Sequence, residues 1–582
     1  MACRKEEEIQ DPDMLAIGKE IARKCSGVPP VVRTVGSLLF FKKTKLEWLH
    51  FKEKELPEVS QREDRIMSIL RLSYYHLPSH LKQCFALCSL FPKDYEIKKQ
   101  TLVNLWVAEG FIEPSNRSQH LDDIAHGYFM DLLWSNFFQD FQRDPFTEVE
   151  TCKMHDLMHD LACLVAGTEC WVAWDDTKSV LKRTRRISHG LTFNVIGELP
   201  ISRFRASTLR TFFSVVPKPM YGEMEQREPT SEADLRLIIQ SCKSLRILDV
   251  YATNVKKVPR SICKLKHLTY LDCSHNSALK RLPDSITRLQ NLQTLNLYGC
   301  SALEELPRGI RELVSFRNLY IDDCQKLSYM PCELGQLSSL HRLTHFILPK
   351  DKTLAKNYCG LGELNGLNNI RGSLSIENLK HVSDVVAESK AANLIGKSSL
   401  ESLELHWGYL ESDDAVTRDR DEALLDGLRP HSNLQKLKID GYEGESFPRW
   451  MMNSLVISLP NLVEQGLKSL WSVDIRCVPK LASLPQWLLQ LSDLHLLSIR
   501  NCLNLKALPE QIEALQSLQW LEIIRCPSLT SLPKGMRGLA SLNHLRIAGC
   551  MDLEERCKED AGEDWYKIAH IPHVSHQLRS YD

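Results

Sequence analysis

The 582-residue sequence lacks several features that would assign it to a common class. It has no uninterrupted apolar run of about 18 residues, the length that crosses a bilayer, so we expect no membrane span. The opening residues, MACRKEEEIQDPD, are acidic and polar and do not resemble a secretory leader. The 73 basic and 74 acidic residues leave a net charge of −1, without the basic excess typical of nucleic-acid-binding proteins. We therefore expect an intracellular, cytoplasmic protein, with nuclear entry left open, that binds proteins or small ligands.

A 24-residue repeat is present instead. The pattern LxxLxL recurs as LRILDV, LTYLDC, LQTLNL and FRNLYI from residues 245, 268, 292 and 316, and as LHLLSI, LQWLEI and LNHLRI from residues 494, 518 and 542. Prolines recur 24 residues apart within each block, at Pro259, Pro283, Pro307 and Pro331 and at Pro485, Pro509 and Pro533. Such units bury their leucines only by stacking, which predicts a leucine-rich-repeat solenoid with parallel strands along its concave side.

The repeat also accounts for many of the 19 cysteines. No CxxC pair and no metal-ligand spacing accompany them, so reduced thiols are expected. Five cysteines and one asparagine fall three residues after the last apolar strand position, where we predict buried structural side chains: Asn276, Cys300, Cys324, Cys502, Cys526 and Cys550.

Between the two blocks the period blurs. LESLELHW and LQKLKI still read as repeat strands, and the charged stretch ESDDAVTRDRDEALLDG as a solvated loop or helix face. The nearby AANLIGKSS fits a permissive phosphate-loop pattern ending at Gly396, Lys397 and Ser398. A working phosphate loop follows a strand and opens a helix. Here a helix-like segment precedes and a repeat strand follows, so we predict that Gly396 ends a helix and that Lys397 is solvated.

The first 165 residues lack the repeat and read as several short helices, followed by an alternating strand that runs into a helix in FTEVETCKMHDLMHDLACLVAG. These residues carry a family resemblance. CSGVPPVV resembles the GLPLA element of the plant NB-ARC disease-resistance receptors, LSYYHLPSHLKQCFALCSLFPKDYEI and LVNLWVAEGFI resemble their winged helix, and KMHDLMHDLA contains their MHD motif. The tail EDWYKIAHIPHV resembles the ending of coiled-coil-type members. The resemblance implies the helical and winged-helix C-terminal half of an NB-ARC domain followed by leucine-rich repeats, an α/β protein.

The resemblance further implies an ADP/ATP switch. Its nucleotide-binding positions match Gly27, Pro29, Met154, His155 and Asp156. His155, the phosphate-contacting histidine, is expected at a strand-to-helix junction where free N–H groups attract anions and where Asp156 can cap the helix. The alternative is that Met154 is a core residue and His155 is merely placed by the fold. The family's phosphate loop and acidic strand are not found before the GLPLA element, so ADP or ATP binding is expected to be weak or lost.

Two other interpretations concern the same segments. His155 and His159 stand four residues apart, as in a zinc protease, but Asp replaces the glutamate base and no third ligand is evident, so no metal is expected. A winged helix can also bind DNA, but Leu105, Trp106 and Phe111 look like core residues rather than base-reading residues. We expect no nucleic-acid partner.

The polar strand residues of the repeats are predicted to form a protein-binding concave face. Exposed tyrosine, tryptophan and arginine dominate binding hot spots. The candidates are Arg246, Tyr270, Arg317, Tyr320, Trp520 and Arg546. The alternative is that this face is partly solvated or contacts the chain's own switch module.

The sequence thus indicates a non-enzymatic fragment of a plant intracellular immune receptor whose repeats recognise a pathogen effector or a guarded host protein. Two other interpretations are a non-signalling scaffold or decoy that partners a full-length receptor, and an incomplete gene model of a normal receptor. The expected organisation is a helical part (1–60), a winged-helix part (61–165), a junction with irregular first repeats (166–230), a first repeat block (231–345), an irregular region (346–465), a second repeat block (466–556) and a tail (557–582).

Overall fold

A computed structural model describes residues 12–25, 29–42, 44–56, 65–114, 119–144, 149–172, 183–190, 208–215, 232–350, 360–408, 415–451, 467 and 469–577. It divides into two compact units, which we call the first unit (residues 1–276 and 291–295) and the second unit (277–290 and 296–582). None of the helices in the described ranges combines the length and apolar character that a bilayer crossing requires.

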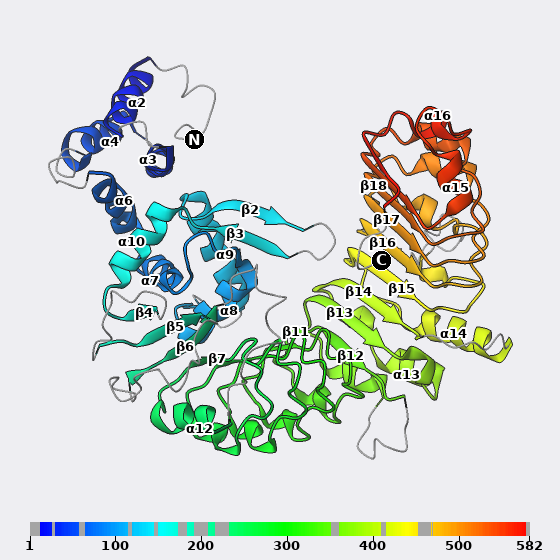
Figure 1. Ribbon diagram of the computed structural model, residues 1–582, viewed down its shortest axis with the longest axis horizontal. Coiled ribbons are helices and arrows are strands. Elements are labelled where there is room, and N and C mark those ends of the chain that lie inside the picture. The colour runs from blue at the N-terminus through cyan, green and yellow to red at the C-terminus, as the bar shows by residue number, and fades with distance from the viewer. Residues whose placement is uncertain are drawn as a thin grey trace, which may run out of the picture. The chain divides into compact units, whose positions relative to one another are not determined.

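The first unit begins with helices, as the sequence predicts (Figure 1). They are α2 (Pro12–Lys24), α3 (Pro29–Phe41), α4 (Lys45–His50), the π-helical turn η1 (Phe51–Glu55), α6 (Arg65–His76), α7 (Ser79–Leu87), η2 (Cys88–Leu90), α8 (Lys99–Glu109), α9 (Leu121–Trp134) and α10 (Asp156–Ala166). Strands β1 (Ile97–Lys98), β3 (Glu150–Lys153) and β2 (Gln139–Arg143) form an antiparallel sheet in that order. Helix α8 is central, and Leu105, Trp106 and Phe111 are buried core residues, as predicted.

A parallel ladder of strands continues the first unit. It consists of β4 (Cys170–Val172), β5 (Arg186–Gly190), β6 (Thr211–Val215), β7 (Ile247–Asp249) and β8 (Tyr270–Asp272), with helix α12 (Glu232–Ser241) and the 3-10 turn η6 (Arg260–Lys264). One buried hydrophobic cluster joins winged-helix residues to this ladder. For example, the rings of Phe91 and Phe213 meet edge to face with centroids 5.2 Å apart.

Strand β9 (Thr294–Asn296) falls at the division, and the second unit contains the remaining repeats. Strands β10 (Asn318–Tyr320) and β11 (Arg342–Leu343) pair in parallel. A nine-stranded sheet then runs in chain order through β12 (His345–Ile347), β13 (Gly372–Glu377), β14 (Leu400–His406), β15 (Lys436–Asp440), β16 (Ser472–Arg476), β17 (Leu496–Arg500), β18 (Trp520–Ile524), β19 (His544–Ala548) and β20 (His573–Ser575). The predicted leucine-rich-repeat solenoid is confirmed.

Turns and short helices connect the strands. The 3-10 turns are η7 (Asp284–Arg288), η8 (Ile310–Glu312), η9 (Leu334–Gln336), η10 (Leu361–Gly366), η11 (Leu379–His381), η12 (Leu394–Gly396), η13 (Arg449–Met451), η14 (Leu488–Gln490), η15 (Glu510–Ala514) and η16 (Lys534–Gly538). The helices are α13 (Val385–Ala391), α14 (Ala415–Gly427), α15 (Met551–Arg556) and α16 (Trp565–Ile568). Pro283, Pro509 and Pro533 stand immediately before η7, η15 and η16, where a missing N–H costs nothing.

The predicted ladder of buried cysteines and asparagine is confirmed. Asn276 Oδ1 accepts a hydrogen bond from the backbone of Val255 at 2.7 Å, and its Nδ2 donates to the carbonyl of Val250 at 2.9 Å. The cysteines at the same repeat position are also buried, and the thiol of Cys324 donates to the carbonyl of Leu297 in the preceding repeat at 3.2 Å. The residue before each ladder position has a left-handed φ of 53° to 70°, at His275, Gly299, Asp323, Asn501, Arg525 and Gly549.

The irregular region corrects one prediction. Gly396 ends the turn η12, and strand β14 follows, as expected for a repeat and not for a phosphate loop. Lys397, however, is fully buried rather than solvated. Its Nζ donates to the carbonyls of Leu364 and Leu367 at 2.6 and 3.1 Å, and burial lowers its pKa to about 8. The lysine adds a second donor to the carbonyl of Leu364, which already accepts the Leu367 N–H, and also binds the carbonyl of Leu367.

The charged stretch before β15 forms helix α14 and is only partly solvated. Leu424 and Leu425 are fully buried, and the buried Asp421 has its pKa raised by desolvation to about 6. The predicted helix face is therefore present, but its other side packs against the repeats.

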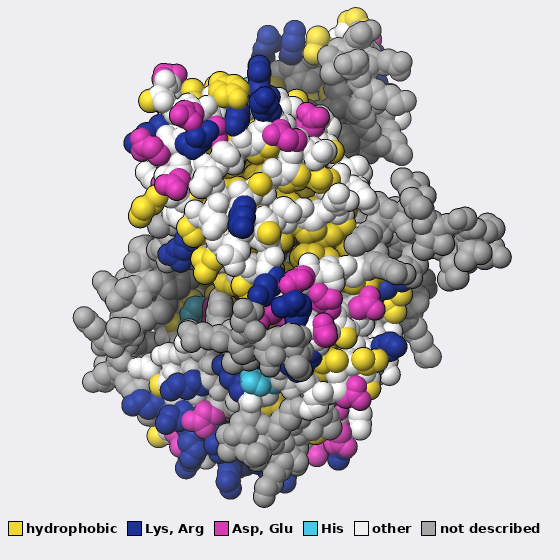
Figure 2. Space-filling model, turned by 90° about the vertical axis from the view of Figure 1, so that its right-hand side faces the viewer, with side chains coloured by type: hydrophobic (Ala, Val, Ile, Leu, Met, Phe, Trp, Pro, Cys, Tyr) yellow, Lys and Arg dark blue, Asp and Glu magenta, His cyan; other side chains and the backbone are white. Residues whose placement is uncertain are grey.

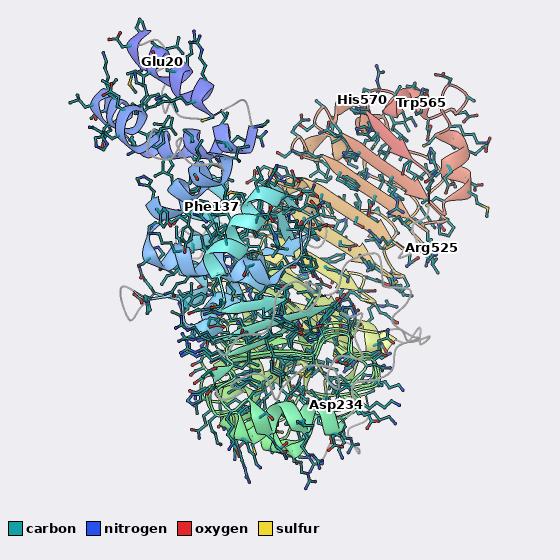
Figure 3. The ribbon with its side chains drawn as sticks, turned by 60° about the vertical axis from the view of Figure 1, so that its left-hand side comes forward. Glu20, Phe137, Asp234, Arg525, Trp565 and His570 are labelled. Carbon is teal, nitrogen blue, oxygen red and sulfur yellow. The ribbon has the colours of Figure 1, made fainter. Side chains whose placement is uncertain are left out.

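The C-terminal end of the solenoid is covered by α15, α16 and β20, near the labelled Trp565 and His570 (Figure 3). Lys567 Nζ donates to the carbonyl of Leu532 at 2.6 Å and to Asp564 at 2.8 Å. Asp564 in turn accepts from the backbone of Leu532 at 2.8 Å. A buried ion pair thus closes the last regular turn of the array.

Candidate functional sites

The MHD residues lie where strand β3 runs into helix α10, as predicted. Met154 is buried, His155 is half-buried and Asp156 is exposed. His155, and not Asp156, supplies the cap: its Nδ1 accepts a hydrogen bond from the backbone of Leu157 at 3.1 Å. The expected Asp156 cap is therefore wrong, because the histidine one position earlier is the residue with extended backbone at the N-cap. Since Nδ1 accepts, the ring proton of a neutral His155 resides on Nε2.

His159 has a structural role. Its Nε2 lies 2.8 Å from the carbonyl oxygen of Phe91, and burial lowers its pKa. Within the described ranges, no group of three or more histidine, cysteine, aspartate or glutamate side chains is placed to hold a metal ion.

The other positions matched to a nucleotide site are less well placed. Pro29 is the exposed first residue of α3, and Gly27 lies outside the described residues. A cavity of about 480 Å³ lies between α3, α6, α7 and α9, but neither Pro29 nor His155 lines it. Of the matched positions, the described residues thus offer one N–H donor, His155 Nε2, and one exposed proline ring. The exposed carboxylate of Asp156 beside the donor opposes an anion.

The end of α8 forms a buried ion-pair centre with the first strands of the ladder. The Glu109 carboxylate is inaccessible to solvent. It pairs with Arg186 of β5 at 3.2 and 3.4 Å and accepts a hydrogen bond from the hydroxyl of Thr211 on β6. The Arg186 guanidinium also lies over the ring of Phe111, 5.3 Å from its centroid. A buried carboxylate is tolerated when it is paired and hydrogen-bonded in this way.

Two concave residues of the next repeats bind the carbonyls that end α8. Arg246 donates to the carbonyl of Glu109, and the Thr269 hydroxyl donates to that of Ala108 at 3.0 Å. The last carbonyls of a helix have no partner within the helix, and a cation there also complements the helix dipole. Gly110 permits this approach, since its φ is +78° and an added Cβ would stand 3.1 Å from Arg246. The predicted hot-spot residue Arg246 thus contacts the chain's own winged helix.

Two further predicted positions are buried rather than exposed. Tyr270 is 3% exposed, belongs to the cluster that includes the winged-helix core, and donates to Asp272 at 2.7 Å. Arg546 is also 3% exposed and pairs with Glu522. The prediction of exposed side chains is wrong at both sites, because neighbouring parts of the chain cover these strand positions. Arg317, Tyr320 and Trp520 are half-buried and keep accessible surface.

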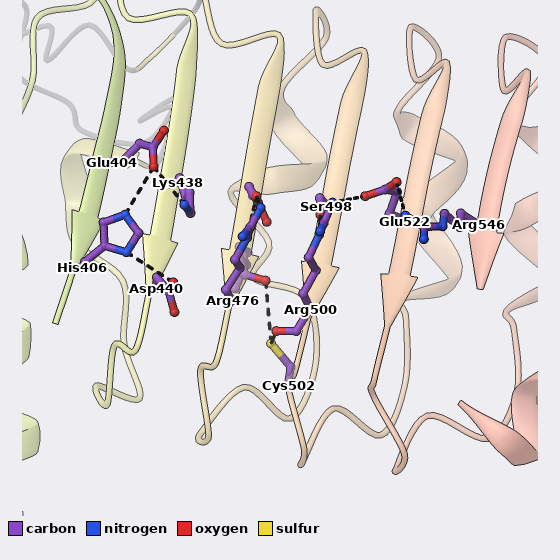
Figure 4. A network of polar contacts seen from close by, with 12 residues as sticks. Glu404, His406, Lys438, Asp440, Arg476, Ser498, Arg500, Cys502, Glu522 and Arg546 are labelled. Carbon is purple, nitrogen blue, oxygen red and sulfur yellow. Dashed lines mark hydrogen bonds and ion pairs between the residues drawn. The ribbon is translucent and has the colours of Figure 1, made fainter. Parts of the chain in front are cut away.

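Polar side chains form rows across the strands of the second unit (Figure 4). The parallel register places the following residues in one row: Glu404, Lys438, Asp474, Ser498, Glu522 and Arg546. His406 connects this row to the next. Its two ring nitrogens lie 3.3 Å from Glu404 and 3.3 Å from Asp440. Burial alone would lower the pKa of His406, but these hydrogen bonds to carboxylates raise it to about 9.

Glu522 is the centre of a second network. Its carboxylate is inaccessible to solvent and binds Arg500 of β17 at 2.5 Å and Arg546 of β19 at 3.4 Å. Arg500 also donates to the hydroxyl of Ser498 at 2.9 Å, and Arg546 donates to the carbonyl of Gln577 at 2.9 and 3.1 Å. The three charged side chains therefore hold three strands and the C-terminal segment together.

The row next to Glu522 holds a stack of rings. Trp520, His544 and His573 occupy equivalent positions of β18, β19 and β20. Their ring centroids are separated by 4.3 Å and 4.6 Å. The stack is half-buried to exposed, and it makes Trp520 part of a flat aromatic surface rather than an isolated side chain.

Sequence reasoning missed Glu109 and the His406 network. An acidic residue in the last turn of a helix opposes the helix dipole, and this placement was the signal available for Glu109. For His406, the signal was opposite charges at equivalent positions of successive repeats, which become cross-strand neighbours. On the face shown in Figure 2, basic and acidic side chains are interspersed.

Comparisons with known proteins agree with this architecture. The family described as "Disease resistance protein Winged helix domain" matches residues 90–162, and the family "R13L1/DRL21 LRRs" matches residues 361–502. The chain is 38% identical over 82% of its length to the putative disease resistance protein RGA1 and 35% identical over 82% to disease resistance protein RGA2, both of Solanum bulbocastanum. It is 33% identical over 75% of its length to a putative disease resistance RPP13-like protein 1 of Arabidopsis thaliana.

A winged helix followed by a leucine-rich-repeat solenoid defines a class of proteins built around protein-binding surfaces. With these relatives, the chain belongs to the family of plant disease-resistance proteins. It spans 43%, 44% and 40% of the length of the three relatives named above.

Proposed function

We propose that this chain is the sensing and restraining part of a plant intracellular immune receptor. Its repeats bind a pathogen effector or a guarded host protein, and its winged helix belongs to an ADP/ATP switch that the repeats hold in a resting state. The protein acts by binding and not by catalysis, in the cytoplasm. The observation that carries the proposal is the contact of α8 with the concave side of the first repeats.

That contact is suited to restraint. Glu109, Arg186 and Thr211 make charge-assisted hydrogen bonds away from solvent, and Arg246 and Thr269 satisfy the helix-end carbonyls. Separating the surfaces would leave a buried carboxylate and two carbonyls without partners, which is costly unless water or a new partner replaces them. A partner that competes for the concave side of these repeats would therefore shift the winged helix away from its docked position.

The partner-binding residues are proposed to be Arg317, Tyr320 and Trp520. These three predicted hot-spot residues keep accessible surface, whereas the other three are buried or bound to the chain itself. Trp520 adds a stacked surface that an aromatic or cationic side chain of a partner can cover.

Affinity purification of the full chain from challenged leaf tissue tests this assignment. The wild-type chain should retain a pathogen or host protein that is reduced at least about tenfold by Trp520→Ala, the loss expected for a hot-spot side chain. Glu559→Ala changes an exposed residue outside the strands and serves as the control. Identical captured proteins for all three chains would contradict the assignment.

Hydrogen exchange tests the restraint. Arg246→Ala should increase amide exchange in α8, because it removes the donor to the Glu109 carbonyl. Arg317→Ala, an arginine outside this contact, should leave exchange in α8 unchanged. Equal exchange in α8 for both variants would refute the docked restraint.

For the nucleotide, we propose weak ADP binding in which His155 Nε2 donates to a phosphate oxygen. When bound, the nucleotide would supply the negatively charged phosphate. The chain would orient the imidazole of His155 toward it through the hydrogen bond from the Leu157 N–H to Nδ1. In calorimetry, any ADP binding should weaken with His155→Ala. Binding that is micromolar in wild type and unaffected by this change would refute the assignment.

A further inference from the structure

The cavity in the first unit is separate from the proposed nucleotide contacts. Its volume is about 480 Å³, within the range of small-molecule sites. It is lined from one side by α3 and from the others by the ends of α6 and α9 and the start of α7. The labelled Phe137 in Figure 3 marks its winged-helix wall.

The inner wall of the cavity is apolar and firmly held. Leu77, Leu81 and Phe137 line it and are themselves at most 8% exposed. At one end, Ser37 of α3 donates to the carbonyl of Trp134 at the end of α9, at 3.2 Å, and so ties the two sides together. An apolar body of a small molecule would lose its hydration on this wall.

A buried hydroxyl lacks a partner at the same site. Ser73 lines the cavity and is 1% exposed, and its Oγ makes no hydrogen bond. Buried polar atoms are paired in nearly all cases, and an unpaired hydroxyl on a cavity wall is a hydrogen-bonding point for a ligand.

The carboxylate of Asp131 adds a negative charge to the wall. Asp131 stands in the last turn of α9, where no basic residue balances it and where a negative charge opposes the helix dipole. Partial desolvation raises its pKa, against the smaller lowering effect of His80. A cation beside Asp131 would offset both the desolvation of its carboxylate and the unfavourable interaction of that charge with the helix dipole.

The other titratable lining residues do not supply that cation in an ion pair. Lys42 lines the cavity, but its Nζ lies 5.5 Å from the ring centroid of Phe51, which is not part of the lining. His76 is exposed at the rim. Among the described residues, no ion pair to Asp131 is formed.

We propose that this cavity binds a small amphipathic amine, with its apolar body against Leu77, Leu81 and Phe137 and its ammonium group beside Asp131. Because residues of both α3 and α9 line the cavity, such a ligand binds best when the helical part and the winged helix keep this arrangement. It therefore stabilises that arrangement by its difference in affinity.

Calorimetry on the full chain with two matched probes tests the proposal. 4-Phenylbutylamine should bind about two- to fivefold more tightly than 4-phenylbutan-1-ol, which has the same body without the charge, because Asp131 is exposed and an ion pair to it is screened by solvent. Asp131→Asn should abolish this preference and keep the weaker binding of the alcohol. Asp123→Asn, the same change on the exposed N-terminal turn of α9, should preserve the preference.

A second variant tests the location. Ser73→Leu places bulk in the cavity and should remove binding of both probes, with folding checked by circular dichroism. The proposal is overturned if neither probe binds, if both bind equally to the wild-type chain, or if Asp131→Asn leaves amine binding unchanged. Asp131 is exposed, so its variant remains informative even if Ser73→Leu does not fold.

Discussion

Replacing Glu522 with glutamine should destabilise the last repeats strongly. The carboxylate is inaccessible to solvent and is bound by Arg500 and Arg546 at 2.5 and 3.4 Å. Glutamine keeps the shape of the side chain but leaves two buried guanidinium groups without their counter-charge. Breaking a buried pair costs about 3–5 kcal/mol. Because glutamine keeps one oxygen that can accept from an arginine, we expect a loss of about 3 kcal/mol.

The effect should be local, because each repeat contacts mainly its neighbours. Hydrogen exchange measures it directly: amides of β17, β18 and β19 should lose protection by a factor on the order of 100, the equivalent of about 3 kcal/mol. Thermal unfolding of the C-terminal repeats should fall by roughly 6–12 °C. The strands of the first unit should be unaffected.

Glu559→Gln is the matched control, since it removes the same charge at an exposed position after α15. It should change stability by less than about 0.5 kcal/mol. If Glu522→Gln behaved like this control, the two arginines would have to be stabilised by something other than Glu522, and the assignment of the network's centre would be wrong.

Three further predictions concern buried polar groups. The fold raises the pKa of His406 to about 9 from 6.5, so the stabilisation by this group is complete below pH 6.5 and is lost as pH rises through 9. In urea unfolding between pH 6 and 9.5, the wild-type chain should therefore lose on the order of 3 kcal/mol, and His406→Gln should abolish this loss. The pKa of Lys397 is lowered to about 8 from 10.5, so the pH dependence of its contribution to stability has the opposite sign. Between pH 8 and 10.5 the unfolded chain binds a proton that the folded chain does not, and the free energy of unfolding should rise with pH; Lys397→Met should eliminate this rise. Asn276→Ala should cost about 1–3 kcal/mol in denaturant unfolding, because it leaves the buried N–H of Val255 without a partner, whereas the carbonyl of Val250 keeps the Thr253 hydroxyl as its donor. A cost below about 0.5 kcal/mol would contradict the ladder's role.

The repeat could be predicted from the sequence because one physical constraint recurs every 24 residues. A leucine that must be buried by stacking, and a side chain such as Cys324 that must fill a fixed position behind the strand, leave the same trace in each unit. Leu105 and Trp106 in the winged helix were equally predictable, because large apolar side chains at helical spacing seldom have another role.

The errors arise where burial depends on another part of the chain. Alternation in a strand places Tyr270 and Arg546 on the concave face, but it does not tell whether a helix end or a neighbouring charge covers them. Lys397 was predicted to be a surface lysine because the carbonyls it binds belong to the preceding repeat, about 30 residues earlier in the chain. The nucleotide contact of His155 and the identity of the partner stay predictions, since both depend on groups outside this chain.

The left-handed residue before each ladder position has an evolutionary consequence. His275, Gly299, Asn501 and Arg525 turn the backbone in the same way, although their side chains share nothing. These repeats therefore begin and end with the same backbone geometry. A unit of 24 residues can be duplicated or deleted by recombination, and the backbone on either side still joins in the same conformation. A solenoid built in this way can be lengthened or shortened by whole repeats, and the residues between the leucines can then diversify separately.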